Sequence, residues 1–308
     1  MQLVSIALCT YNGEKYLAEQ LDTLVGQDYP NLEVVALDDG SKDNTLAILR
    51  TYEARYPFFK VYQNEQNLGY IRNFEKAISL CQGELIALAD QDDIWELHKI
   101  SLMVGEIKDN LLLYHNSEFI TEEGLSMGRK MSDIRNFYAG NDSRVFLMEN
   151  CVSGHAMLFK KELVSFFSAF DTNSFHDWWI VYMAACNGSV GFINDCLVKY
   201  RQHTQANTNI LRLDRGQAKK RNALLQIEKE YKRIQVFEAY AHNNFQSFKS
   251  RLLKLTERRM KAYFSFSLFF FMYRHQDKLL FIQKKSKLSK FNFMLKYAWG
   301  YKLKQLLA

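Results

Sequence analysis

Residues 85–95 read Leu-Ile-Ala-Leu-Ala-Asp-Gln-Asp-Asp-Ile-Trp, so that an apolar run is followed at once by Asp90, Asp92 and Asp93. Like charges at this spacing repel one another unless something positive lies between them. A divalent cation is the guest that this pattern predicts, and oxygen ligands favour Mg²⁺ or Mn²⁺. Taken alone, the cluster is equally typical of a solvated turn or a helix N-terminus, where carboxylates accept backbone N–H groups.

Apolar, strand-like runs alternate with helical patterns along the first 95 residues. We expect strands at 3–8, 32–37, 59–62 and 84–89, and helices at 16–25, 43–49 and 71–80. Such alternation predicts an α/β fold with a mostly parallel central sheet and helices on both faces. In such sheets ligands collect at the carboxyl ends of the strands. The polar clusters Thr10–Asn12, Asp38–Asp39 and Asp90–Asp93 all lie at such ends.

The pattern after residue 110 is less regular. We expect strands near 111–115, 154–159 and 191–197, a helix at 178–186, and long amphipathic helices within 217–241 and 248–261. The most apolar piece, residues 263–273, is about half of the roughly 20 residues that a membrane-spanning helix needs. We therefore expect no transmembrane helix there.

Composition indicates an ordinary globular protein of one or two domains, with 308 residues and 48% apolar residues. The five cysteines are scattered, without C-x-x-C spacing, which argues against a disulfide framework or a thiolate zinc site and fits a reducing compartment. The first residues lack a basic segment and a small-residue cleavage site, so they read as a strand rather than a signal peptide. These features predict a cytoplasmic protein.

The net charge of +6 conceals a strong asymmetry. Residues 209–308 hold 23 lysines and arginines against 6 aspartates and glutamates, whereas residues 1–208 are net acidic. An acidic first part suits a metal-binding enzyme, and a basic second part suits an anionic surface such as phospholipid or nucleic acid. We therefore divide the chain at 208/209.

Several ordered blocks resemble the family-2 glycosyltransferases, which have a GT-A fold, a Rossmann-like α/β architecture. They are S-I-A-L-C-T-Y-N-G (5–13), A-L-D-D-G-S-K-D-N-T (36–45), N-L-G-Y-I-R-N-F (67–74) and A-D-Q-D-D-I-W (89–95). Later, S-G-H-A-M-L-F (153–159), H-D-W-W (176–179) and Y-R-Q-H (200–203) resemble bacterial rhamnosyltransferase-like members. The resemblance implies a catalytic domain over 1–208, with a nucleotide-sugar-binding half (1–95) and an acceptor half (96–208), followed by a basic, aromatic-rich helical appendage.

The resemblance also implies roles for residues near the donor. Thr10, Tyr11 and Asn12 would line the nucleotide pocket, Asp39 would accept the imide N–H of uracil or thymine, and Arg72 would lie near the base or diphosphate. The donor would then be a UDP- or dTDP-sugar. The alternatives are a core aromatic for Tyr11 and a turn-forming residue for Asp39.

The same resemblance makes Asp92 the principal ligand of Mn²⁺ or Mg²⁺, with Asp90 assisting through the metal, a water or the donor ribose. His203 would return to the diphosphate or metal; its alternative is a surface loop residue. Asp93 would either support the ligands or cap a helix entered at Ile94. A metal here would act as a Lewis acid on the departing nucleotide diphosphate.

In the family, an acidic residue before the acceptor-half helix takes the proton of the attacking hydroxyl, and Asp177 matches it. Its alternative is an N-cap. His176, Trp178 and Trp179 are candidate acceptor contacts, against an exposed helix-start histidine and two core aromatics. His155 stands where family members often have Cys or Asn, which makes it an acceptor-side candidate and leaves the acceptor preference open.

These features predict an inverting sugar transferase of bacterial cell-surface polysaccharide synthesis, with L-rhamnose from dTDP-L-rhamnose favoured among possible sugars. A sugar-1-phosphate nucleotidyltransferase would normally carry a glycine-rich basic loop after the first strand, which residues 9–13 lack. A third reading is a nucleotide-sugar-binding or membrane-tethering module without catalysis.

The basic region interleaves Lys and Arg with Phe, Tyr, Trp and Met. This pattern predicts peripheral contact with anionic lipid on the inner face of the cell membrane, which fits a lipid-linked saccharide acceptor. The alternative is an appendage whose aromatics pack on the catalytic domain or in a homodimer. No nucleic-acid-binding module accompanies the charge, so we expect no nucleic-acid partner.

Overall fold

The computed structural model describes residues 1–167, 170, 175–203, 211, 223–240 and 245–306. The chain divides into two compact units. The first comprises Met1–Asp133, Phe137–Asn141 and Val152–Asn207, and the second comprises Ile134–Asn136, Asp142–Cys151 and Thr208–Ala308. Residues 204–210 and 212–222, which include the expected 208/209 boundary and the start of the helix expected from 217, lie outside the described residues.

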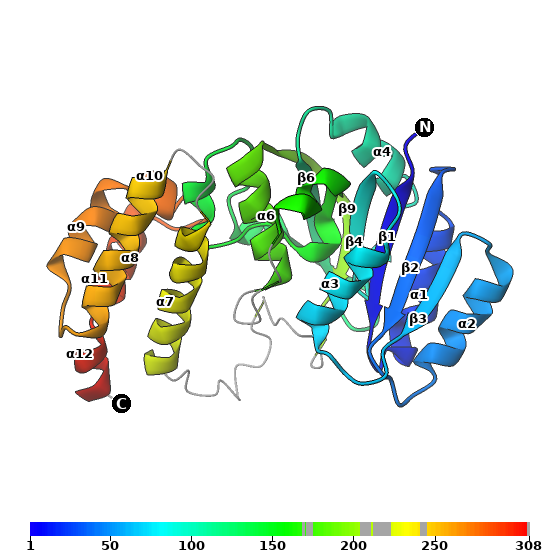
Figure 1. Cartoon of the computed structure of the whole chain (residues 1–308), viewed down its shortest axis with the longest axis horizontal. Coiled ribbons are helices and arrows are strands. Elements are labelled where there is room, and N and C mark those ends of the chain that lie inside the picture. The colour runs from blue at the N-terminus through cyan, green and yellow to red at the C-terminus, as the bar shows by residue number, and fades with distance from the viewer. Residues whose placement is uncertain (168–169, 171–174, 204–210, 212–222, 241–244, 307–308) are drawn as a thin grey trace. The chain divides into compact units, whose positions relative to one another are not determined.

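A nine-stranded sheet organises the described part of the first unit, in the order β3-β2-β1-β4-β8-β6-β9-β5, with β7 paired to β6 (Figure 1). Its strands are β1 (Val4–Thr10), β2 (Leu32–Asp38), β3 (Phe59–Gln63), β4 (Leu85–Ala89), β5 (Ile94–Trp95), β6 (Leu112–Ile120), β7 (Ser126–Lys130), β8 (Met157–Lys160) and β9 (Val190–Arg201). Four neighbouring strands, β3, β2, β1 and β4, are parallel.

Helices cover both faces of this parallel half. They are α1 (Glu14–Val25), α2 (Thr45–Arg55), α3 (Tyr70–Leu80) and α4 (Lys99–Glu106). Val4, Ile6 and Leu8 share one core with apolar residues of α1, α2 and α4. Alternate residues of a strand point to opposite faces, and α3 contacts β1 and β2 through a buried apolar stripe, Ile71, Phe74, Ala77 and Ile78. The predicted α/β sandwich is therefore confirmed.

The second half of the sheet is mixed. Strand β8 runs antiparallel to both β4 and β6, whereas the long strand β9 runs parallel to β6 and antiparallel to β5. The short helix α5 (Met131–Ile134), the 3-10 turns η1 (Ser143–Phe146), η2 (Gly154–Ala156) and η3 (Lys161–Phe166), and helix α6 (His176–Asn187) complete the elements before β9. Residues from beyond position 150 thus reach the carboxyl edge of the parallel half.

One local expectation is wrong. Ile94 does not begin a helix that Asp93 could cap, because Ile94 and Trp95 form β5 by pairing with Lys199 and Val198 of β9. The next helix, α4, begins only at Lys99. A tertiary pairing with a strand 100 residues away overrides the local pattern here.

The second unit is helical. Its helices are α7 (Ala223–Ala239), α8 (Gln246–Met260), α9 (Phe266–Arg274), α10 (Gln276–Leu279), α11 (Lys287–Ala298) and α12 (Tyr301–Leu306). Buried Arg259 holds three of these elements together: it pairs with Glu230 at 2.8 Å, donates to the Trp299 carbonyl at 3.1 Å and stacks over Tyr297. Within the described ranges no helix combines the length and the apolarity that crossing a bilayer requires.

Two short segments from before residue 152 also belong to this helical unit. The Asn136 side-chain amide donates to the Phe281 carbonyl at 2.9 Å, Gln283 donates to Glu149 at 2.6 Å, and Arg144 stacks over Phe245. The second unit is therefore not built from the tail alone.

Candidate active site

The carboxyl ends of three adjacent parallel strands bring three polar loops to one edge of the sheet. Strand β1 lies between β2 and β4, with Thr10 opposite Asp38 and Leu8 opposite Ala89. The ends of these strands and the loops that follow them contain Thr10–Gly13, Asp38–Ser41 and Asp90–Asp93. The sheet topology thus places the predicted polar clusters together, as expected for this class of sheet.

Hydrogen bonds join the loop after β1 to its neighbours. Asn12, which has a positive φ of 48°, accepts from the Lys42 N–H at 2.8 Å and donates its own N–H to Ser41 Oγ at 2.9 Å. The Gln91 side chain accepts from the Tyr11 N–H at 2.8 Å and donates to its carbonyl at 3.2 Å. Tyr11 is 46% exposed, so it is not a core aromatic.

Both carboxylates after β2 are buried and bonded to loop backbone. Asp38 accepts the N–H groups of Gly40 and Ser41 and the Thr10 hydroxyl. Asp39 accepts the N–H groups of Leu68 and Gly69 at 2.8 and 2.9 Å, together with the Asn64 amide. Because of these bonds, Asp38 shapes its own turn, and Asp39 holds the loop between β3 and α3 across the end of β2.

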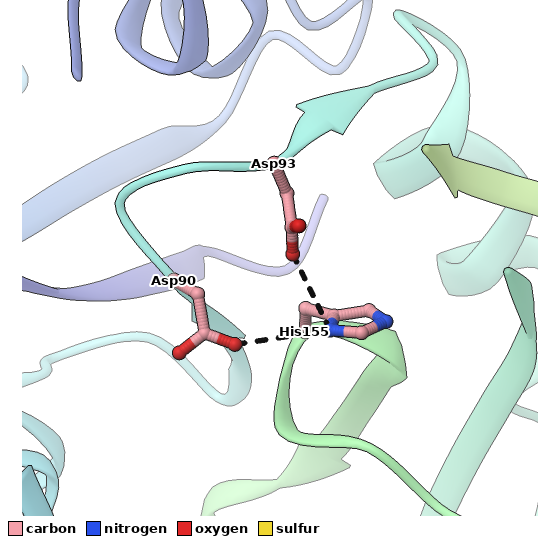
Figure 2. Close-up of side chains that lie close together, drawn as sticks. All are labelled: Asp90, Asp93 and His155. Carbon is pink, nitrogen blue, oxygen red and sulfur yellow. Dashed lines mark ion pairs between the residues drawn. The ribbon is translucent and has the colours of Figure 1, made fainter. Parts of the chain in front are cut away.

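The carboxylates after β4 have different surroundings. Asp92 Oδ2 lies 2.8 Å from His203 Nε2, so His203 is not a surface loop residue. Asp90 and Asp93 point from the two ends of the loop toward the ring of His155, whose Nδ1 lies 3.7 Å from Asp90 Oδ2 and 3.3 Å from Asp93 Oδ2 (Figure 2). The carboxylates of this loop therefore face two histidines from later in the chain: Asp90 and Asp93 face His155, and Asp92 faces His203.

Contacts with Ser117 and Lys99 hold His155 in position. Its Nε2 lies 2.9 Å from Ser117 Oγ, and its carbonyl accepts a bond from the buried ammonium of Lys99 at 2.6 Å. The Lys99 Nζ also lies 3.0 Å from the centre of the Trp95 ring. Burial lowers the pKa of Lys99 well below its usual value, while the charges of Asp93 and Asp90 oppose that shift.

The role predicted for His155 at the acceptor stays a prediction. The side chain is buried, and its two ring nitrogens face Ser117 and the carboxylates. It therefore also lies against the acidic cluster. Sequence reasoning missed this because η2 and β8 reach Asp90 through the antiparallel pairing of β8 with β4, which no local pattern encodes.

Arg201, at the end of β9, ties the acidic loop in place. Its backbone N–H donates to Asp93 Oδ1 at 3.0 Å, and its guanidinium donates to the Asp92 carbonyl at 2.8 Å and to Glu19 at 2.6 Å. His203 follows two residues later and packs on Tyr16. The charged side chain of Y-R-Q-H is therefore a structural clamp, which sequence reasoning did not single out.

Helix α6 brings the H-D-W-W residues to the same unit. Phe175 is the N-cap, so Asp177 lies in the first turn rather than at the cap, where it accepts the Trp178 N–H at 2.6 Å. Its charge is a secondary cause, after burial, of the raised pKa of Tyr70. Tyr70, the first residue of α3, packs against the two residues before Asp177, with ring centres 6.2 Å from Phe175 and 6.0 Å from His176.

Two neighbours of Asp177 are buried. His176 stacks on Phe74 with ring centres 4.2 Å apart and packs against Gly154, so it is not an exposed histidine. Burial lowers its pKa to about 4. Trp179 is buried against Tyr182, which makes it a core residue, whereas Trp178 stays partly exposed.

Arg72 lies on α3, where it pairs with Glu75 one turn further on at 2.5 Å. It is partly exposed, and its position at the start of α3 follows the loop that Asp39 holds.

The acidic cluster fits a divalent cation. One ligand atom each from Asp90, Asp93 and His155 lie within 4.8 Å of one another. Asp93 Oδ2 is buried and lacks a hydrogen-bond donor within the described residues, and burial together with Asp92 and Asp90 raises the pKa of Asp93 well above its usual value. A dication would give the buried Asp93 Oδ2 a partner and would favour the charged form of this carboxylate. The second pair, Asp92 and His203, offers the same types of ligand atom, a carboxylate oxygen and an imidazole nitrogen.

Comparison with known proteins places this site in a family. A family model described as "Glycosyl transferase family 2" matches residues 5–166. An uncharacterized glycosyltransferase of Rickettsia typhi is 28% identical over 216 residues, covering 67% of this chain and 66% of that protein. One from Haemophilus influenzae is 33% identical over 108 residues, covering 35% and 33%. The chain thus spans less than two thirds of the length of these relatives.

Solved structures share the fold. Staphylococcus aureus TarS in complex with UDP-GlcNAc superposes with a TM-score of 0.60 at 20% identity, covering 82% of this chain and 70% of that chain. The mannosyltransferase PcManGT from Pyrobaculum calidifontis, in complex with GDP-Man and Mn²⁺, gives a TM-score of 0.52 at 17% identity, covering 99% and 86%. At these identities the likeness concerns the fold.

Proposed function

Because the chain belongs to glycosyl transferase family 2, we propose that it transfers a sugar from a nucleotide diphosphate donor to the hydroxyl group of an acceptor. The observation that carries the proposal is the acidic loop after β4, whose carboxylates face His155 and His203 at the edge where the loops after β1 and β2 also end. Two structural neighbours were solved with nucleotide sugars.

We propose Mn²⁺ or Mg²⁺ at this loop, held by Asp90 and Asp92 with His203, or by Asp90 and Asp93 with His155. A bound cation would supply Lewis-acid stabilisation of the diphosphate leaving group. The structural neighbour PcManGT was solved with Mn²⁺. The protein itself orients the loop through Arg201 and Gln91.

For the donor we propose a dTDP- or UDP-sugar bound across the loops after β1 and β2, with Thr10, Tyr11, Asn12, Asp39 and Arg72 at the nucleotide. Tyr11 is exposed, whereas Thr10 is buried and donates its hydroxyl to Asp38. Asp39 already accepts three donors. An imide N–H must therefore share the carboxylate with the loop of Leu68 and Gly69, or replace it.

For the chemical step we propose Asp177 as the general base. A carboxylate that accepts the proton of the acceptor hydroxyl lets the oxygen attack the anomeric carbon from the face opposite the leaving group, which inverts the configuration. Partly exposed Trp178 is the neighbouring aromatic available to an acceptor. The sugar that we propose, from the H-D-W-W and Y-R-Q-H blocks, is L-rhamnose.

We further propose that the acceptor is a saccharide or lipid-linked saccharide of bacterial cell-surface polysaccharide synthesis, and that the protein works in the cytoplasm at the inner face of the membrane. The basic region 209–308 would provide peripheral contact with anionic lipid. Homodimerisation is compatible with this contact.

The test is a screen of nucleotide sugars with Mn²⁺ or Mg²⁺, read by thermal stabilisation and by release of nucleotide diphosphate, since a ligand that binds the native state raises apparent stability. We expect dTDP-L-rhamnose or a UDP-sugar to stabilise the protein and to be turned over. Proton NMR should show that the anomeric configuration of the product is inverted relative to the donor. A product that retains the donor configuration contradicts the role of Asp177. Binding with no turnover on any acceptor supports the non-catalytic module instead.

A further inference from the structure

Helix α9 carries an aromatic stripe that faces away from its own unit. Leu268, Phe271 and Met272 are buried. Phe266, Phe270 and Tyr273, at the spacing i, i+4 and i+7, are 68%, 63% and 51% exposed. Residues at that spacing share one face of a helix. An ordinary surface helix would present polar residues there.

Helix α11 extends this surface. It contacts α9, and Phe269 meets Phe291 edge to face with ring centres 5.6 Å apart while also lying beside Phe270 and Tyr273. On α11, Leu288 is 70% exposed and Phe291 is 38% exposed. We call the five exposed side chains the aromatic face: Phe266, Phe270, Tyr273, Leu288 and Phe291.

The sequence around the aromatic face is strongly basic, with Asp277 as the one acidic residue between 258 and 308. Residues 278–308 contain eight lysines and no aspartate or glutamate. Lys284, Lys285 and Lys287 are exposed directly before Leu288, and Lys285 Nζ lies 4.8 Å from the centre of the Phe293 ring. Apolar side chains bordered by lysines suit an interface that is apolar below and negatively charged at its surface.

We propose that the aromatic face docks on an anionic phospholipid surface, with Phe266, Phe270 and Leu288 entering the acyl boundary and the lysines of 284–290 meeting lipid phosphates. A second copy of the chain fits less well. A twofold contact places the same patch against itself and would oppose like-charged lysines. Helix α9 has nine residues and cannot span the bilayer, so the docking is peripheral.

This inference rests on the membrane contact proposed above and assigns that contact to the aromatic face. It does not depend on the transfer of a sugar. Each basic residue near an anionic surface strengthens binding about fivefold, and a buried aromatic side chain contributes at least as much. Removing two of either kind should therefore weaken binding about tenfold or more.

The experiment is sedimentation of the full-length chain with vesicles of phosphatidylglycerol and phosphatidylcholine, compared with phosphatidylcholine alone. We expect binding only with the anionic lipid, and a loss of about tenfold or more in both the F266S/F270S and the K285Q/K287Q variants. The matched controls are Leu125→Ser and Lys60→Gln, which change exposed residues of the first unit and should bind like the wild type.

Light scattering and nucleotide-diphosphate release complete the test. Equal binding to neutral vesicles, or full binding by F266S/F270S, overturns the proposal. A wild-type dimer that becomes a monomer in F266S/F270S assigns the face to a second copy and also overturns it. Lipid binding that persists while no donor is turned over leaves the docking standing and contradicts the transferase proposal alone.

Discussion

The loops after β2 and β4 both place aspartates at the same edge of the sheet, but the aspartates of the two loops have different partners. Asp38 and Asp39 accept backbone N–H groups from two loops. Asp90 and Asp93 face a histidine, and Asp93 Oδ2 is buried with no donor among the described residues. Asp38 and Asp39 therefore shape loops, whereas Asp93 accepts one backbone N–H through Oδ1 and keeps Oδ2 available to a cation.

The strongest test of this contrast is Asp92→Asn. The proposed cation provides several kcal/mol of charge stabilisation at the leaving group, so we expect transfer to fall by about 10³-fold. The melting temperature should stay within about two degrees of the wild type, because Asp92 is not bonded to backbone N–H groups in the way Asp38 is. Steady-state kinetics measures the loss of transfer, and calorimetry measures the melting temperature. Turnover within tenfold of the wild type would mean that Asp92 does not hold the cation.

A buried histidine beside this edge predicts acid sensitivity. His176 has a pKa near 4 in the folded protein, below the value of about 6.5 in an unfolded chain. The unfolded state therefore binds more protons between these values, and stability is full above about pH 6.5 and declines as pH falls toward 4. The expected loss is up to about 3 kcal/mol.

His176→Phe keeps the stacking on Phe74 and removes the titration. Urea unfolding at several pH values between 7.5 and 4.5 should show a flatter profile for this variant than for the wild type. Parallel profiles would mean that other groups cause the acid sensitivity.

Asp38→Asn tests the other loop. Asp38 accepts two backbone N–H groups and two hydroxyls, and hydrogen bonds to a charged group contribute about 1.5–3 kcal/mol. We expect the free energy of unfolding to fall by about 2 kcal/mol, measured by urea titration. Mn²⁺ affinity should be unchanged in the folded protein; a loss comparable to that of Asp92→Asn would erase the distinction between the loops.

The smallest expected effect separates the two histidines. If the cation sits between Asp90 and Asp93, His155→Gln should lower Mn²⁺ affinity about tenfold to a hundredfold, and His203→Gln should have little effect. The reverse order assigns the cation to Asp92 and His203. Titration calorimetry or Mn²⁺ electron paramagnetic resonance measures this without turnover, with exposed His98→Gln as the control.

The local pattern predicted the parallel half well, because β1, β2, β3 and β4 are short apolar runs separated by clear helical stripes. It also placed Asp90, Asp92 and His203 near one another through the resemblance to the family. It missed His155, Lys99 and Arg201, since these meet the acidic loop through β8, α4 and β9. Pairings between strands that are distant in the sequence depend on the whole sheet. A short local sequence pattern therefore does not predict them.

The burial of His176 and Trp179 shows a second limit. Aromatic residues at the start of a helix can face solvent or the core, and α6 packs against α3 in a way that the H-D-W-W block does not reveal. Asp177 and Trp178 keep partial exposure on the same turn.

The clamp formed by Arg201 has a consequence for biosynthesis. Its guanidinium and backbone hold a loop that is made more than 100 residues earlier, so the acidic loop lacks these contacts until the end of β9 leaves the ribosome. Contacts of such long sequence separation form late and slowly. A nascent chain arrested before residue 201 would lack the contacts that Arg201 and His203 make with the acidic loop.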